Sequence, residues 1–209
     1  MNIQTWFSKL IGLLEKNETI INELDTFIGD GDHGSNIVRG FKACLKDSNF
    51  LTCNSFQEGL VIISNHLMND VGGSSGPLYG IGFLAIAETI KGKANITNAD
   101  LSAAFQSAFD RVSELGGTKL NEKTVIDPLH ACIAAFKNSS AKELDFVGAA
   151  KAAYKVCVDE MPLAATKGRA SYLGERSKDH MDPGMYSFYV IMCSLADINP
   201  EPAVVVKKK

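Results

Sequence analysis

The stretch MNIQTWFSKLIGLLEKNE, residues 1–18, shows the pattern that decides the fold. Its apolar residues Trp6, Leu10 and Leu14 recur at helical spacing, so they lie on one face of an amphipathic helix over about residues 2–17. The stretch has neither the basic start nor the small-residue cleavage site of a secretory signal peptide. We therefore interpret it as the first helix of a folded domain.

The same helical spacing recurs almost to the end of the chain. It predicts seven further helices, at about residues 36–47, 54–69, 76–91, 98–115, 125–138, 144–161 and 184–197. Alternating strand patterns are almost absent, and the Val204–Val206 triplet is too short to form a strand. Eight helices with mostly short links predict an all-α fold, an antiparallel up-and-down bundle closed into a helical barrel.

No internal repeat, low-complexity stretch or linker divides the chain. We therefore expect a single domain over residues 1–209, in which about 198–209 form a frayed tail. Cap chemistry supports several of the predicted helix starts. We expect Asn98 or Asp100 to cap the fifth helix and Ser75 to open the fourth.

Composition excludes several classes of protein. The 21 Lys and Arg residues against 24 Asp and Glu give a net charge of −3, without the basic excess that nucleic-acid binding requires. The apolar stretches are far shorter than the roughly 18 residues of a membrane span. The five Cys residues form no C-x-x-C pair, which favours reduced, buried thiols over disulfides or zinc. We expect a cytoplasmic protein that binds neither nucleic acid nor membrane.

The connections between the predicted helices differ in length and composition. Those at about 18–35 and 162–183 are long and rich in glycine and charge, while 71–77 and 115–124 are glycine-rich. Long connections in a compact domain are usually functional or disordered. These four follow the first, third, fifth and seventh helices, so in an antiparallel bundle they meet at one end. We place the functional site at that end.

The strongest local motif is LDTFIGDGDHGSN, residues 24–36, which holds Asp25, Asp30 and Asp32 within eight positions. Crowded carboxylates repel one another unless cations lie between them, and oxygen-only ligation suits Mg²⁺. The helix that begins at His33 offers free N–H groups to anions. The motif lacks the ligand spacing of an EF-hand. Taken alone, it also fits a solvated Asx/Gly turn.

Three further motifs fit either a nucleotide site or an ordinary bundle turn. VGGSSGPLYG, residues 71–80, is a glycine-rich helix start but not a Walker A sequence. KGRASYLGERSKDHMDPG, residues 167–184, gathers cations in an acidic chain, and its Arg169 has the geometry to fork onto phosphate oxygens. LGGTKLNEKTVIDP, residues 115–128, is either a bundle turn or a base-binding edge.

Together these motifs resemble the nucleotide-binding L subunits of the phosphoenolpyruvate-dependent dihydroxyacetone kinases. The four matching stretches, 24–36, 71–80, 116–124 and 167–184, span nearly the whole chain in order. The resemblance implies an eight-helix barrel closed at one end over tightly bound ADP. It implies that the phosphohistidine of an M subunit, charged through the phosphotransferase system, rephosphorylates this ADP. The γ-phosphoryl group then passes to dihydroxyacetone on a K subunit, giving dihydroxyacetone phosphate.

The resemblance also implies the site residues. Asp25, Asp30 and Asp32 match the aspartates that hold two Mg²⁺ ions at the nucleotide phosphates. Nucleotide contacts are implied for His33, Gly34, Ser35, Asn36, Ser74, Ser75, Gly116, Val125, Arg169, Asp182, Pro183 and Gly184. No side chain is assigned a catalytic role, because phosphoryl transfer depends mainly on positioning and electrostatics. Relatives often have Ala in place of Ser74, and Pro-Gly in place of Leu120–Asn121.

Two other functions stay open from the sequence. One is the nucleotide-binding half of an ATP-dependent kinase, which is normally fused to a sugar-binding domain; the absence of a linker or second domain in 209 residues argues against it. The other is a nucleotide-sensing module that contacts a transcriptional regulator, a role that can coexist with the kinase role. A fatty-acid kinase domain fits less well, because those proteins read D-G-D-T-G.

Overall fold

The computed structural model describes residues 2–205, and the regular elements in this part of the chain are all helices. They are α1 (Ile3–Ile28), α2 (His33–Ala43), α3 (Ser48–Thr52), α4 (Phe56–Asp70), α5 (Ser75–Ile90), α6 (Asn98–Gly116), α7 (Ile126–Asn138), α8 (Phe146–Asp159) and α9 (Pro183–Ala196). Two 3₁₀ segments, Cys44–Lys46 and Arg169–Ser177, lie in the connections. The predicted all-α fold is confirmed.

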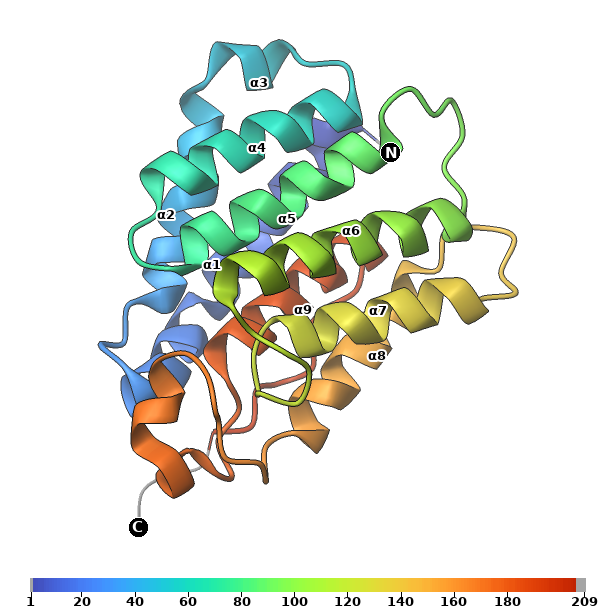
Figure 1. Cartoon of the computed structure of the whole chain (residues 1–209). Coiled ribbons are helices and arrows are strands. Elements are labelled where there is room, and N and C mark those ends of the chain that lie inside the picture. The colour runs from blue at the N-terminus through green and yellow to red at the C-terminus, as the bar shows by residue number, and fades with distance from the viewer. Residues whose placement is uncertain (1, 206–209) are drawn as a thin grey trace.

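The long helices form a closed ring (Figure 1). Helices α1, α2, α4, α5, α6, α7, α8 and α9 each pack against the next, and α9 packs back onto α1. The short α3 is an extra turn between α2 and α4. The predicted eight-helix closed bundle is therefore confirmed, since each of the eight predicted segments corresponds to one long helix.

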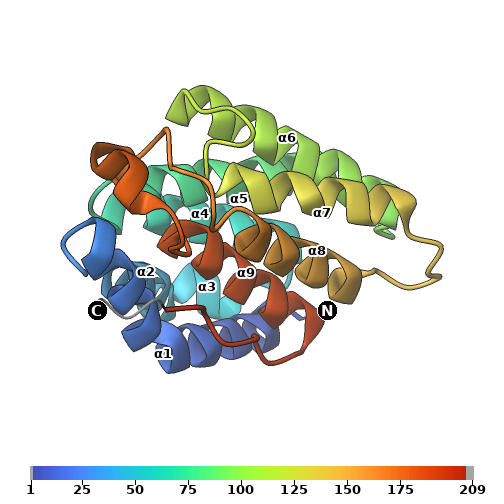
Figure 2. The same cartoon turned by 90° about the horizontal axis from the view of Figure 1, so that it is seen from below.

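Helix α9 lies deeper in the bundle than the other helices, which surround it in Figure 2. Its residues from Met185 to Ser194 are all buried, and it contacts α1, α2, α7 and α8. The sequence of this stretch, MYSFYVIMCS, is apolar on every side, as expected for a helix with no solvent-facing surface. The hydroxyl of Ser194 is satisfied there by the indole N–H of Trp6 at 2.9 Å.

The first helix is longer than the sequence analysis predicted. It continues from residue 17 through Ile28, so most of the expected loop 18–35 is helical. The cause is an apolar face that extends through Ile21 and Leu24, with no glycine between residues 17 and 29 to stop the helix. Asp25 therefore lies in the last turn of a helix, and only residues 29–32 connect α1 to α2.

The predicted cap of α6 also differs from the structure. Thr97 caps this helix, because its hydroxyl accepts from the backbone N–H of Asp100 while the Asp100 carboxylate accepts from the N–H of Thr97. Asn98 instead donates its side-chain amide to the backbone carbonyls of Ala141 and Glu143, which holds the α7–α8 connection. For α5, the capping position is Ser74 rather than Ser75.

The tail is packed along part of the stretch that we expected to fray, 198–209. Hydroxyls of Tyr186 and Tyr189 hydrogen-bond the backbone of Glu201 at 3.0 and 2.8 Å, so this stretch is held against α9. Periodicity does not reveal these contacts, because the tyrosines that bind the tail backbone are buried by segments distant in sequence. Residues 206–209, including the last valine of the triplet, lie outside the described residues.

The interior is one continuous apolar cluster, with the largest buried side chains contributed by Trp6, Phe7, Phe41, Phe136 and Tyr186. All five cysteines are free and buried, as predicted, and Cys44, Cys132, Cys157 and Cys193 belong to this cluster. Among the described residues, no helix is long and apolar enough to cross a bilayer.

The start of α2 packs tightly onto α1. A Cβ atom placed on Gly34 would lie 2.5 Å from the Glu18 carbonyl oxygen and 2.8 Å from the Asn22 side-chain oxygen. The neighbouring Ser35 donates its hydroxyl to the Glu18 carboxylate at 2.7 Å and its N–H to Asn22 at 3.1 Å. This contact fixes the direction in which the N-terminus of α2 points.

We expect Gly34→Ala to lower the free energy of unfolding by roughly 1–3 kcal/mol, because the added methyl group forces α2 away from the α1 backbone. Gly12→Ala is the matched control: the site lies within α1 with no atom within 4 Å of the new Cβ. It should instead stabilise the protein by about 0.5–1 kcal/mol. Urea denaturation measures both, and equal changes at the two positions would contradict the packing argument.

Candidate functional site

The four loops named in the sequence analysis meet at one end of the bundle, as predicted. They surround an open cleft of about 840 Å³. In Figure 1 the α8–α9 connection lies at this end, beside the α1–α2 loop and the α6–α7 loop. Clefts of this size hold small ligands in many proteins.

Three carboxylates form one corner of the cleft. Asp25, Asp30 and Asp32 can each offer an oxygen within 4.8 Å of the other two. Asp25 is only 5% exposed, and its carboxylate accepts the backbone N–H groups of Asp32 and His33 at 3.0 and 3.2 Å. The buried carboxylate is therefore held in place, while Asp30 and Asp32 face solvent.

Arg169 reaches this corner from the α8–α9 connection. Its guanidinium pairs with Asp30 at 2.5 Å, and this hydrogen bond lowers the pKa of the Asp30 carboxyl. Gly29 makes the approach possible, because a Cβ there would lie 2.9 Å from the Asp25 carboxylate and 3.2 Å from the Arg169 guanidinium. One cation thus faces three carboxylates.

The donor set of this corner fits a hard divalent cation. All the candidate ligand atoms are carboxylate oxygens, which suit Mg²⁺ and not the sulfur and nitrogen chemistry of zinc. Three negative charges with a single guanidinium beside them leave an uncompensated charge that a divalent ion would neutralise. Asp25, Asp30 and Asp32 are therefore the residues that could hold Mg²⁺.

Two helix N-termini border the same cleft. Helix α2 begins at His33 beside the carboxylates, and α5 begins at Ser75 after the loop of Gly72, Gly73 and Ser74. Neither start is capped by a side chain from its own N-cap residue. At the start of α2, the N–H groups of His33 and Ser35 already donate to Asp25 and Asn22. The N–H groups at the start of α5 have no side-chain acceptor from its N-cap residue, so they can donate to an anion such as phosphate.

The opposite side of the cleft is apolar. It is lined by Leu78, Val112 and Val125, with Gly116 and Thr118 at its edge. Apolar walls with a few polar groups are typical of pockets that hold a flat ring. Both predicted residues of this side, Gly116 and Val125, line the cleft.

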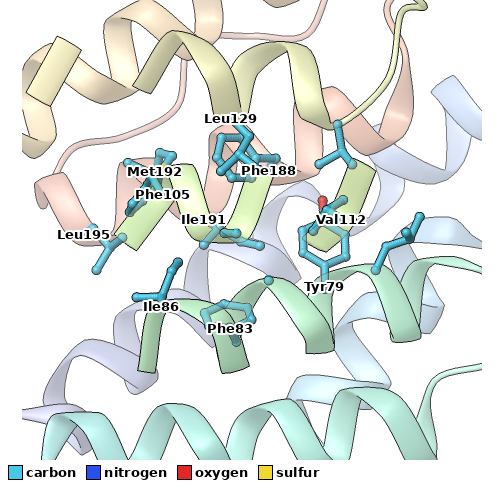
Figure 3. A pocket seen from close by; sticks show the side chains of 14 residues that line it. Tyr79, Phe83, Ile86, Phe105, Val112, Leu129, Phe188, Ile191, Met192 and Leu195 are labelled. Carbon is cyan, nitrogen blue, oxygen red and sulfur yellow. The ribbon is translucent and has the colours of Figure 1, made fainter. Parts of the chain in front are cut away.

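Below this wall lies a smaller cavity of about 60 Å³ between α5, α6, α7 and α9, shown in Figure 3. Its labelled side chains include Phe83, Phe105, Ile191 and Met192, and the one hydroxyl among its lining residues belongs to Tyr79. This cavity has no charged lining, so it is an extension of the core and not a phosphate site.

His33 links three helices at the edge of the cleft. Its Nε2 lies 2.8 Å from the hydroxyl of Ser187, which lies 2.8 Å from the hydroxyl of Tyr79. Tyr79 also donates to the Gly184 carbonyl at 3.0 Å. Burial lowers the pKa of His33, so the ring is neutral at pH 7. His33 therefore joins α2 to α5 and α9.

Most of the residues that the sequence analysis named line the cleft, including all three aspartates, His33, Asn36, Ser74, Ser75, Gly116, Val125, Arg169, Asp182 and Gly184. Gly34, Ser35 and Pro183 do not line it. The first two face α1, and Pro183 is buried at the start of α9.

The analysis of the sequence missed several cleft residues: Arg39, Tyr79, Thr118, Lys123 and Lys167. Lys123 and Lys167 stand inside motifs that were quoted, and their charge in an acidic chain was the available signal. Nothing local distinguishes a buried lysine from the solvated lysines around it, because burial depends on the packing of distant segments.

A buried acidic group lies behind the cleft. Glu160 is 8% exposed, and its Oε2 has no hydrogen-bond partner among the described residues. Burial, together with repulsion from Asp127, raises the pKa of Glu160 to about 7. Asp182, which caps α9 through the N–H of Met185 at 2.9 Å, has its pKa raised by burial to about 6.

Comparisons with known proteins agree with this geometry. The model of the DAK2 domain matches residues 27–197. The ADP-binding subunit of the PTS-dependent dihydroxyacetone kinase of Lactococcus lactis subsp. lactis (strain IL1403) is 34% identical over 193 residues, which are 92% of this chain and 94% of that protein. The ADP-binding subunit of the PEP-dependent dihydroxyacetone kinase of Escherichia coli (strain K12) is 32% identical, covering 93% and 94%.

Solved structures show a similar fold. The native dihydroxyacetone kinase of C. freundii superposes with a TM-score of 0.71 at 22% identity. The match covers 93% of this chain but 34% of the kinase, so the chain spans about a third of that protein. The same kinase in complex with AMP-PNP and Mg²⁺ also gives a TM-score of 0.71, at 21% identity.

We expect the three-carboxylate corner to bind Mn²⁺, used as a probe for Mg²⁺, and Asp32→Asn to weaken this binding at least about tenfold by removing one charged ligand. Asp110→Asn is the control, since this exposed carboxylate lies on α6 and accepts a hydrogen bond from the Gln106 amide in its own helix. Calorimetric titration measures the affinities. Equal Mn²⁺ affinity of wild type and Asp32→Asn would exclude the proposed ligands.

Glu160 should make stability dependent on pH. Its pKa is higher in the folded protein than in the unfolded chain, so the folded state binds the extra proton and stability falls as pH rises from about 4.5 through 7. Glu160→Gln should remove roughly 2 kcal/mol of this decline between about pH 5 and 8. Urea midpoints across this range measure it, and an unchanged slope would contradict the assignment.

Proposed function

The chain belongs to the DAK2 domain family, and from that premise we propose that it is the ADP-binding subunit of a phosphoenolpyruvate-dependent dihydroxyacetone kinase. The observation that carries the proposal is one cleft in which three carboxylates and the N-termini of α2 and α5 face an apolar wall. Such a cleft has a place for metal, phosphates and base. Relatives named as ADP-binding subunits match nearly the full length of the chain.

In this proposal, Asp25, Asp30 and Asp32 hold two Mg²⁺ ions at the nucleotide phosphates. The bound metal would neutralise phosphate charge that the protein's own groups leave unbalanced. The chain holds one of these carboxylates in a fixed position. Two backbone N–H groups fix the Asp25 carboxylate, so at least one ligand is positioned before any ion arrives.

The proposed nucleotide lies across the cleft. Its phosphates meet the start of α2, with His33 and Asn36, and the start of α5, with Ser74 and Ser75. Its base lies against Gly116 and Val125. Arg169 approaches the phosphate end, with Asp182 and Gly184 at the start of α9 beside it. Gly34, Ser35 and Pro183 do not contact the nucleotide in this proposal. Their packing fixes the directions of α2 and α9.

The proposed reaction needs no nucleophilic side chain from this chain. The nucleotide serves as a phosphoryl carrier, charged by a phosphohistidine of an M subunit and discharged onto dihydroxyacetone held by a K subunit. The residues of the cleft position the transferred group and stabilise its charge, which is the main requirement of phosphoryl transfer. We propose further that the whole chain acts as one nucleotide-binding domain in the cytoplasm, where five free thiols stay reduced.

A turnover experiment tests this function. The protein is loaded with radiolabelled ATP, freed of excess nucleotide, and mixed with a K subunit and dihydroxyacetone. We expect no more than one labelled sugar phosphate per loaded nucleotide, because the ADP that remains is held in the cleft. Adding phosphorylated M subunit should restore many turnovers without further ATP, since the carrier is recharged in place.

Unphosphorylated M subunit is the control and should leave the yield at the single-turnover level. Sustained turnover on bulk ATP without a phosphohistidine donor would overturn the proposal and favour the nucleotide-binding half of an ATP-dependent kinase.

A further inference from the structure

Lys123 is a buried lysine whose three N–H donors are all used. It is 3% exposed, and its Nζ donates to the backbone carbonyls of Met161 at 2.9 Å, Leu163 at 2.9 Å and Ser177 at 2.8 Å. An ammonium group has three donors and no acceptor, so this set satisfies it completely. All three acceptors belong to a single connection, the one between α8 and α9.

These acceptors lie at the two ends of the segment that carries Arg169. Met161 and Leu163 precede the 3₁₀ segment Arg169–Ser177 and Ser177 is its last residue, so one ammonium group joins the chain before the segment to the end of the segment. Two neighbouring bonds strengthen the same junction, since the Ser177 hydroxyl accepts from the Ala165 N–H at 2.8 Å and Asp179 donates its N–H to the Met161 carbonyl at 2.7 Å.

The loop that presents Lys123 is itself held in an unusual shape. Lys123 has a φ of +62°, a conformation that costs a non-glycine residue energy and persists where surrounding structure imposes it. The Asp127 carboxylate imposes it here, by accepting the N–H groups of Asn121 at 2.7 Å and Thr124 at 2.8 Å. The side chain is thereby aimed under the α8–α9 connection.

The charges around Lys123 suit a permanent anchor. Burial lowers the pKa of Lys123, and the charges of Asp182, Asp179 and Glu160 offset part of this cost of burying the ammonium. The ion pair that joins this connection to the carboxylate corner is weaker. The Arg169–Asp30 pair is about half exposed, and pairs of this kind contribute little on their own.

The same loop also borders the ligand space. Lys123, Thr124 and Val125 all line the cleft, so the residues beside the proposed base are adjacent in sequence to the anchor of the connection above. We propose that Lys123 is a positioning residue that holds the Arg169-bearing connection over the cleft and thereby sets how slowly bound ADP leaves. This inference rests on the proposed function for the identity of the ligand.

The test replaces Lys123 with Met, which has similar length and no donors. We expect Lys123→Met to release ADP, followed in the presence of Mg²⁺, at least tenfold faster than wild type. In the ligand-free protein, amide hydrogen exchange should accelerate in residues 163–179 and stay unchanged in α4 and α5. Lys155→Met is the matched control, because it removes an exposed lysine that pairs with Asp159 within α8. It should change neither measurement.

A double variant separates positioning from general destabilisation. If Lys123 acts through Arg169, Lys123→Met combined with Arg169→Ala should release ADP no faster than Arg169→Ala alone. Additive effects would overturn the proposal. Lys123→Gln keeps two N–H donors and should release ADP at a rate between those of wild type and Lys123→Met. If Lys123→Met does not fold, Lys123→Gln provides the measurement.

The outcomes also separate this inference from the proposed function. Suppose that wild type binds ADP but the folded Lys123→Met and Lys123→Gln variants release it at the wild-type rate. The positioning role of Lys123 is then wrong, while the proposed function stands. If wild type binds no ADP, the proposed function fails. Hydrogen exchange in the ligand-free variants then still supports or overturns the claim that Lys123 holds the α8–α9 connection in place.

Discussion

The repulsion among three carboxylates at the end of α1 is the constraint on which the functional end depends. Asp25, Asp30 and Asp32 come within 4.8 Å of one another, an arrangement that is unstable without compensating charge. The chain supplies part of this compensation through two backbone N–H groups at the start of α2 and through Arg169. A divalent cation bound at this corner would neutralise the negative charge that remains.

The interior of the bundle stabilises the fold, and the loops at one end carry the candidate functional residues. A continuous apolar cluster, with α9 buried along its length, fixes the directions of the helices, and the tight contact of Gly34 with α1 sets the approach of α2. The loops at one end then carry the charges with little cost to the core. The exception is the buried group of Lys123, Asp127 and Glu160, where charged groups form part of the scaffold under the cleft.

This buried group joins two segments of the cleft, the α6–α7 loop and the α8–α9 connection. The α6–α7 loop borders the apolar wall, and the α8–α9 connection brings the cation to the carboxylates. The two segments are far apart in sequence, and the Lys123 ammonium links them through three carbonyl oxygens. The carboxylate corner and the apolar wall of the cleft are therefore held by the same lysine.

The sequence by itself determined the helical class, the eight long helices, the end at which the four loops meet and the aspartate corner, because periodicity and carboxylate spacing are local properties. Only the tertiary structure decided that α1 extends through Asp25 and that Tyr186 and Tyr189 hold the tail. It also decided that Gly34, Ser35 and Pro183 do not line the cleft and that Lys123 is buried. Each of these depends on which distant segment covers a residue, and burial of this kind leaves no periodic trace in the chain.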